Sequence, residues 1–118
     1  NGIIVSNTTL KRSDSLKDKN KNEIGGLSGK PLFLPSTLLL REMYNLTGGK
    51  IPLIGVGGIS TGKDVYEKIK AGASLVQLYT GLVFEGPQII NNINKELYYL
   101  LRADGFNNIS EAIGSDVL

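Results

Sequence analysis

The sequence contains no cysteine and no histidine. Without cysteine the chain has neither disulfides nor thiolate metal sites, and its redox compartment stays open. Without histidine it lacks the most frequent general base and the most frequent metal ligand. The acidic residues are scattered, with no pair at the spacing of a metal site. We therefore expect no metal centre in this chain.

The chain also lacks a large excess of charge of either sign, and it lacks long apolar runs. The formal net charge is only +2, and the lysines and arginines do not line one face, which argues against a nucleic-acid partner. No apolar run reaches the roughly 18 residues of a membrane span. What the chain does have is 41% apolar residues over 118 positions, which is enough for the core of one domain.

The chain opens inside an apolar run, Asn1-Gly2-Ile3-Ile4-Val5, with no methionine or signal sequence before it. Natural proteins rarely begin this way, so we interpret residues 1–118 as the C-terminal segment of a longer chain. A complete β/α barrel needs about 250 residues.

Short apolar runs alternate with amphipathic stretches along the chain. Three buried strands are predicted over residues 2–6, 51–56 and 75–79. Helices are predicted over residues 36–46, 60–72, 87–105 and 110–113, with Ser36 and either Ser60 or Thr61 as N-caps. The alternation predicts an α/β fold, about three β/α units from the C-terminal part of a (β/α)₈ TIM barrel. The polar stretch at about residues 11–24 is predicted to be a mobile loop within this single domain.

Two turns rich in glycine and hydroxyl groups follow the second and third predicted strands. The first contains Gly57-Gly58 and the second is Tyr79-Thr80-Gly81. Glycine lets the backbone approach a ligand, and free N–H groups at a helix start attract anions, so neighbouring turns of this kind favour a phosphate site. Gly57-Gly58 alone would fit an ordinary tight turn better than a phosphate site, and it is the second turn on the adjacent strand that shifts the interpretation toward phosphate. We expect a side chain at Gly58 to occupy the space through which the phosphate approaches.

Asn7 and Thr8 follow the first predicted strand, on the side of a parallel sheet where ligands bind. The asparagine amide carries a donor and an acceptor in one plane, which matches the edge of a pyrimidine ring. Both residues would also serve as local caps of the turn, and spacing alone leaves the two readings open. Ser28 and Gly29, in a glycine-rich turn, either add a contact to the phosphate or shape the loop.

Together these segments resemble dihydroorotate dehydrogenase of class 2, the membrane-associated, quinone-linked form. The resemblance covers most of the chain and is carried by Ser6-Asn7-Thr8-Thr9, Gly25-Gly26-Leu27-Ser28-Gly29-Lys30-Pro31-Leu32, Arg41-Glu42-Met43-Tyr44, Ile51-Pro52-Leu53-Ile54-Gly55-Val56-Gly57-Gly58 and Gln77-Leu78-Tyr79-Thr80-Gly81. It implies a TIM barrel that binds FMN and oxidises (S)-dihydroorotate to orotate in pyrimidine biosynthesis, with a quinone as electron acceptor.

By position, the resemblance assigns substrate contacts to Asn7 and Thr8. It assigns FMN contacts to Ser6, Ser28, Gly29, Gly57, Gly58, Tyr79 and Thr80. It places the catalytic serine base and the quinone tunnel upstream of Asn1, so we expect no catalytic residue in this segment and no activity from the segment alone.

The resemblance also implies association with the mitochondrial inner membrane, or with the bacterial membrane in a prokaryote. Two alternatives stay open at this stage. The chain could belong to another FMN- or phosphate-binding TIM-barrel oxidoreductase, or to a barrel remnant that has lost catalysis.

Overall fold

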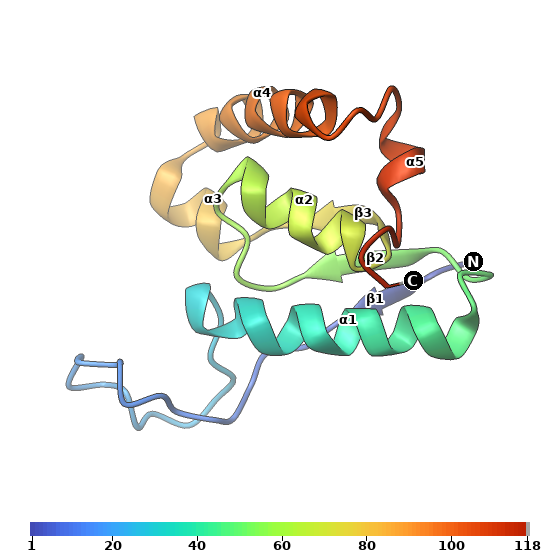
Figure 1. The fold of residues 1–118 in the computed structure, drawn as a ribbon. Helices are drawn as coiled ribbons and strands as arrows, with labels where there is room; N and C mark the ends of the chain where they lie inside the picture. The colour runs from blue at the N-terminus through green and yellow to red at the C-terminus, as the bar shows by residue number, and fades with distance from the viewer. Residues whose placement is uncertain (118) are drawn as a thin grey trace.

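The computed structural model describes residues 1–117 and shows strands alternating with helices (Figure 1). The strands form one parallel sheet in the order β1 (Ile3–Val5), β2 (Leu53–Val56) and β3 (Ala73–Gln77). The helices are η1 (Lys30–Leu32), α1 (Phe33–Thr47), α2 (Gly62–Lys70), α3 (Thr80–Glu85), α4 (Gln88–Ala103) and α5 (Ile109–Ala112). The predicted α/β fold of three parallel units is confirmed.

Helix α1 begins three residues earlier than predicted, and Ser36 is not its N-cap. The short 3₁₀ helix η1 leads directly into Phe33, so the chain is already helical at Ser36. The Ser36 side chain is buried, and its hydroxyl donates to the carbonyl of Phe33 at 3.0 Å. The prediction that Gly48 ends the helix is confirmed, because Gly48 follows the last helical residue and adopts the left-handed conformation with φ 59°.

Helix α2 begins as the sequence predicts, with Thr61 as its N-cap. The Thr61 hydroxyl accepts from the N–H of Asp64, and the Asp64 carboxylate accepts from the N–H of Thr61, which together form a capping box. Strand β3 starts at Ala73, directly after Gly72, and ends at Gln77. It therefore lies two residues earlier in the chain than the alternation of apolar residues predicts.

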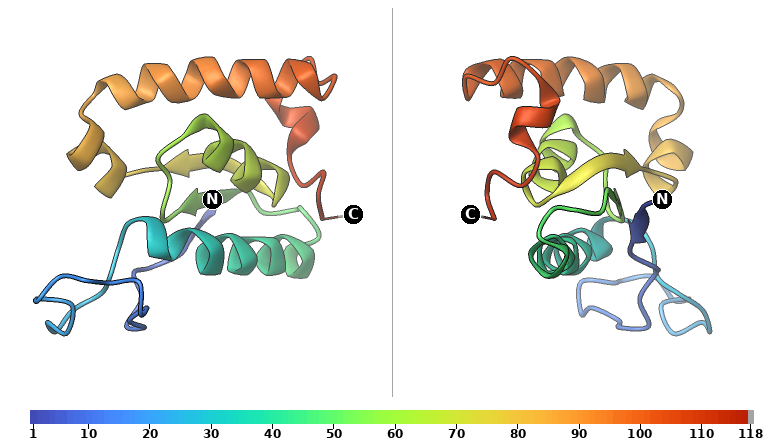
Figure 2. Two further views of the ribbon diagram at one scale, coloured as in Figure 1. Left: turned by 60° about the vertical axis from the view of Figure 1, so that its left-hand side comes forward. Right: turned by 90° about the vertical axis from the view of Figure 1, so that its right-hand side faces the viewer.

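The core lies between the sheet and the helices that cover one of its faces (Figure 2). Helix α2 buries Val65 and Ile69, and α4 packs Ile93 and Leu97 against it. The opposite face of the sheet is exposed in the described residues, and burial of the strands on both faces stays a prediction for a complete barrel. Ile4 is 55% exposed and Leu75 is 64% exposed, and both align with Ile54 across the sheet.

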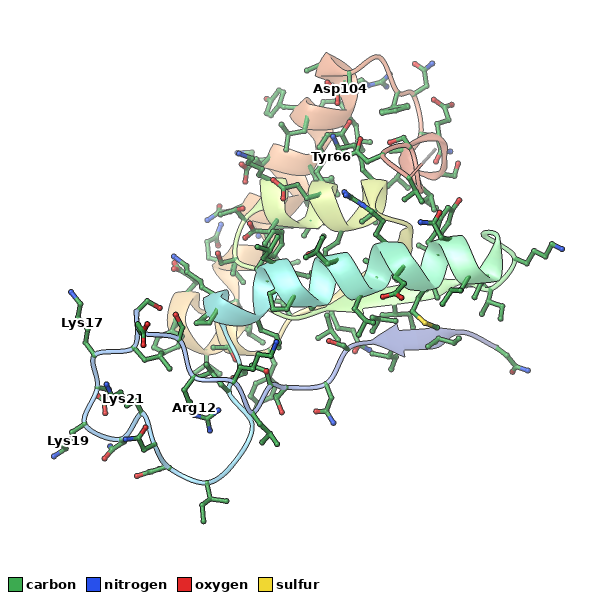
Figure 3. All side chains as sticks on the ribbon, turned by 60° about the horizontal axis from the view of Figure 1, so that its bottom comes forward. Arg12, Lys17, Lys19, Lys21, Tyr66 and Asp104 are labelled. Carbon is green, nitrogen blue, oxygen red and sulfur yellow. The ribbon has the colours of Figure 1, made fainter. Side chains whose placement is uncertain are left out.

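The polar stretch after β1 forms a loop that extends away from the helices, at the same end of the molecule as α3 and the start of α1 (Figure 1). Arg12 holds this loop together from inside, because its guanidinium donates to the carbonyls of Thr9, Lys21, Glu23 and Gly25. Figure 3 shows Lys17 and Lys19 extending outward from the loop. The mobility of residues 11–24 stays a prediction.

Candidate functional site

One cavity of about 770 Å³ lies where the three strands end. It is bordered by all nine residues that the sequence singles out for ligand contacts: Ser6, Asn7, Thr8, Ser28, Gly29, Gly57, Gly58, Tyr79 and Thr80. They come from the loop after β1, the turn after β2 and the start of α3. Because the carboxyl ends of parallel strands meet at one edge of the sheet, residues far apart in sequence converge there.

The loop after β1, the turn after β2 and the turn after β3 contact one another directly. The Ser28 and Thr80 hydroxyls lie 2.9 Å apart and share a hydrogen bond across 52 residues of sequence. Gly81 packs so closely on the first turn that a Cβ there would lie 2.5 Å from the carbonyl oxygen of Ile59. The site is therefore a packed assembly of three segments, and displacement of one segment will move the others.

The structure gives a reason for glycine at position 58 that the sequence does not show. Its φ is +73°, as a tight turn requires, but a Cβ would lie 2.5 Å from the backbone nitrogen of Phe33. The missing side chain leaves room for the first residue of α1, and the expectation that a side chain at Gly58 would block the approach of a phosphate stays a prediction. The conformational and packing requirements on Gly58 come from the protein itself.

Gly29 fits the role first expected of Gly58. Its backbone has φ 87° and ψ −162°, a conformation essentially restricted to glycine. A Cβ at Gly29 would meet a single neighbour, Cγ2 of Thr80 at 3.4 Å, and would otherwise extend into open space beside the cavity. The backbone of Gly29 therefore borders the cavity directly, with no side chain between the backbone and a bound ligand.

The start of helix α2 is closed to anions. Asp64 accepts from the N–H groups of Ser60 and Thr61 at 2.8 and 2.9 Å, and Glu96 of α4 accepts from the N–H of Gly62 at 2.6 Å. Two carboxylates thus already occupy the positive end of this helix.

Free backbone donors lie instead in the turns around the cavity. The N–H groups of Gly29, Gly58 and Tyr79 donate no hydrogen bond within residues 1–117. Together with the Ser28 and Thr80 hydroxyls they form a donor set suited to phosphate oxygens. The residues present therefore fit a phosphate group.

Asn7 and Thr8 lie exposed at the edge of the cavity, next to the end of β1. The Asn7 Oδ1 accepts from the backbone N–H of Thr8 at 2.8 Å, so the amide does cap its own turn. The Asn7 Nδ2 donates no hydrogen bond within the described residues. The cap interpretation is confirmed, and the substrate contact of Asn7 stays a prediction, since the cap uses the oxygen and leaves the amide donor open.

Sequence reasoning missed the apolar wall of the cavity and one cation. The wall consists of Leu32, Val56, Ile59, Leu78 and Phe84. These residues read as ordinary core or helix positions, and only the tertiary structure shows that they line one cavity. Lys30 also borders the cavity and brings a positive charge to it. An apolar wall with a few polar groups is typical of a pocket for a cofactor or other small molecule.

Metal and membrane features are absent from the part of the chain that the structure describes. Residues 1–117 contain no cluster of three or more potential metal-binding side chains. Within the same residues, no helix combines the length and the apolar character that crossing a membrane requires.

Comparisons with known proteins agree with this architecture. Residues 1–101 match the family model described as "Dihydroorotate dehydrogenase". The mitochondrial dihydroorotate dehydrogenase (quinone) of Arabidopsis thaliana is 58% identical over 98% of this chain, and the mitochondrial enzyme of Mus musculus is 55% identical over the same share. A dihydroorotate dehydrogenase (quinone) of Parvibaculum lavamentivorans is also 55% identical over that share.

The similarity extends to three dimensions. The ligand-free crystal structure of the DHODH of Eimeria tenella superposes with a TM-score of 0.94 at 44% identity, over 98% of this chain and 32% of that structure. The three curated relatives are covered over 25, 29 and 33% of their length. The chain thus spans a quarter to a third of the proteins that it matches, and it belongs to the dihydroorotate dehydrogenase family.

Proposed function

We propose that this chain supplies the phosphate-binding end of the FMN site and part of the substrate site of a quinone-linked dihydroorotate dehydrogenase. The observation that carries the proposal is that all nine residues assigned to FMN and substrate from the sequence border one and the same cavity. Family membership supports the cofactor and the substrate, and the names of the relatives support a quinone as acceptor. The rest of the barrel completes the site.

In this proposal the backbone N–H groups of Gly29, Gly58, Tyr79 and Thr80 donate to the FMN phosphate. Backbone donors need no side-chain ordering, and those of Gly29, Gly58 and Tyr79 are free of internal partners. Ser28 and Gly57 shape the turns around the phosphate, and Ser6, at the end of β1, contacts the flavin. The Ser28–Thr80 hydrogen bond keeps two of these donor segments in register.

Asn7 and Thr8 orient the substrate in the same proposal. The free Nδ2 of Asn7 donates to a carbonyl oxygen of dihydroorotate, while Oδ1 stays fixed by the backbone of Thr8. The chemistry that FMN supplies when bound is acceptance of a hydride from dihydroorotate and passage of the electrons to a quinone. The proton leaves to a serine base outside these 118 residues. This chain therefore binds and orients, and it holds no catalytic residue.

We propose that the enzyme works at the mitochondrial inner membrane, or at the cell membrane if the source is bacterial, where quinones are dissolved. Two of the relatives named above are mitochondrial. Membrane attachment in this proposal belongs to a part of the protein other than the described residues.

The test uses a complete barrel, made by putting this chain in place of the matching 116 residues of the Arabidopsis relative. We expect the purified protein to carry FMN, to reduce a quinone with dihydroorotate, and to bind FMN more tightly than riboflavin, which lacks the phosphate. A Tyr79→Phe variant keeps the backbone donor and should retain FMN. A flavin-free protein would refute the proposal, and bound FMN without dihydroorotate oxidation would favour a different flavin enzyme or an inactive remnant.

A further inference from the structure

Lys68 of α2 is the most completely buried charged side chain of the described residues, with 0% of its surface exposed. Its ammonium group donates to the Ser36 and Thr37 hydroxyls, each at 2.8 Å, and lies 4.9 Å from the centre of the Phe33 ring. Gly55 of β2 leaves room for the lysine stem, because a Cβ there would lie 3.0 Å from Lys68 Cδ. The glycine that opens the Gly55-Val56-Gly57-Gly58 motif is thereby explained by packing.

The lysine has no carboxylate partner. Within residues 1–117 no carboxylate oxygen lies within 4.0 Å of its Nζ, and the ion pair of the described residues joins Lys70 to Asp116 instead. Burying an unpaired charge is costly, and burial lowers the pKa of Lys68 to about 8 although Asp64 and Glu67 oppose that shift. A methionine or leucine would fill the same space without this penalty, so packing alone does not account for a lysine here.

The hydrogen bonds of Lys68 fix the direction of a chain of donors that ends at the cavity. An ammonium group has three donors and no acceptor, so Ser36 must accept from it and use its own hydrogen elsewhere. The Ser36 hydroxyl reaches the carbonyl of Phe33 at 3.0 Å and that of Gly57 at 3.3 Å. Thr37 likewise accepts from Lys68 and donates to Phe33 at 2.7 Å. Gly57 directly precedes Gly58 in the turn, and Phe33 is the residue against which Gly58 packs.

We propose that Lys68 is a positioning residue for the ligand phosphate: acting through Ser36, it fixes the carbonyl of Gly57 and so holds the Gly57–Gly58 turn in the conformation that presents its N–H groups to the cavity. The positive charge of Lys68 also favours an anion on the other side of that turn. The inference rests on the proposed function, since it takes the phosphate of FMN as the anion concerned.

The test compares FMN with riboflavin, because the two share the ring system and differ in the phosphate. Dissociation constants are measured by flavin fluorescence on the complete barrel after flavin removal. The substitution Lys68→Met keeps the length of the side chain and removes its charge and donors. Ser36→Ala is the second variant, and it breaks the chain of donors with a smaller change of volume. Lys63→Met is the matched control, since it removes an exposed lysine from the same helix.

We expect Lys68→Met and Ser36→Ala each to weaken FMN binding about tenfold or more, the loss of roughly one hydrogen bond to a charged group. Riboflavin affinity should change by less than about threefold, because riboflavin lacks the phosphate that the turn binds. Lys63→Met should leave both constants unchanged. A parallel loss of FMN and riboflavin binding in the two variants would reduce Lys68 to a general structural residue and overturn the proposal.

Unchanged FMN binding in either variant would also overturn it. If Lys68→Met does not fold, the Ser36→Ala result decides by itself. Failure of the proposed function has a different signature, because the unsubstituted barrel would then show no preference for FMN over riboflavin.

Discussion

Replacing Gly58 by alanine should destabilise the fold more than Gly29→Ala does, although both substitutions should damage the flavin site. Both positions have positive φ, +73° and +87°, so alanine is strained at each by about 1–3 kcal/mol. The difference lies in the surroundings. A Cβ at Gly58 would lie 2.5 Å from backbone and side-chain atoms of Phe33, whereas a Cβ at Gly29 would meet one methyl group at 3.4 Å.

The clash at Gly58 adds an overpacking cost of about 1–3 kcal/mol, because the neighbour is helix backbone that cannot rotate away. We therefore expect Gly58→Ala to lower the free energy of unfolding of the flavin-free barrel by about 2–6 kcal/mol. Gly29→Ala should lower it by about 1–3 kcal/mol, from strain alone.

Urea unfolding of both flavin-free variants measures the stabilities, and absorbance at the flavin maximum measures the flavin content. We expect both variants to lose FMN. Equal unfolding midpoints for the two variants would refute the reasoning, since the packing of Gly58 against Phe33 would then not limit stability. Full flavin content in Gly29→Ala would show that the phosphate does not approach this backbone.

Four further outcomes are expected. The Lys68 pKa of about 8 lies below its value of 10.5 in an unfolded chain, so the unfolded state binds more protons between pH 8 and 10.5. The free energy of unfolding of the flavin-free barrel, relative to that of Lys68→Met, should therefore rise across this range by at most about 3 kcal/mol. A difference between the two proteins that stays constant with pH would contradict the lowered pKa. Asn7→Ala should lower kcat/KM for dihydroorotate about 5- to 150-fold, because about 1–3 kcal/mol of hydrogen bonding to the substrate is lost. The flavin content should stay unchanged, and a loss of flavin instead would place Asn7 on the cofactor. Tyr66→Phe removes the 2.5 Å hydrogen bond to Asp104 that joins α2 to the end of α4 (both residues are labelled in Figure 3). The substitution should lower stability by about 1–3 kcal/mol without altering FMN affinity; an altered affinity would connect this distant pair to the site. The 118-residue chain by itself should not reduce flavin with dihydroorotate, and any turnover by the pure chain would show that a base lies within it.

Most of the site was predictable from the sequence because it depends on local chemistry at strand ends. Turn glycines and short hydroxyl side chains that follow apolar runs identify ligand loops directly, and parallel topology then brings those loops together. The reason for Gly58 was not predictable, because the atoms that exclude its side chain belong to Phe33, which is 25 positions earlier. The burial of Lys68 was not predictable either, because it depends on the packing of α1 on α2.

Element type was likewise easier to predict than element boundaries or neighbours. The capping box at Thr61 is complete within four residues and fixes the start of α2 without help from the rest of the chain. The start of α1 instead depends on η1 before it, and the start of β3 depends on its register with β2. Gly49, Gly72 and Gly114 come from three separate segments, and all three border the ring of Tyr44, which no local pattern reveals.

The sequence by itself determined the alternation of strands and helices, the parallel sheet and the group of residues at its ligand end, because periodicity and turn chemistry act over a few neighbouring residues. Only the tertiary structure decided which N–H groups are free. The donors at the start of α2 are neutralised by Asp64 and by Glu96 of α4, whereas those of Gly29, Gly58 and Tyr79 are not. A donor is free or occupied according to what packs against it, and that is settled when segments distant in the chain meet.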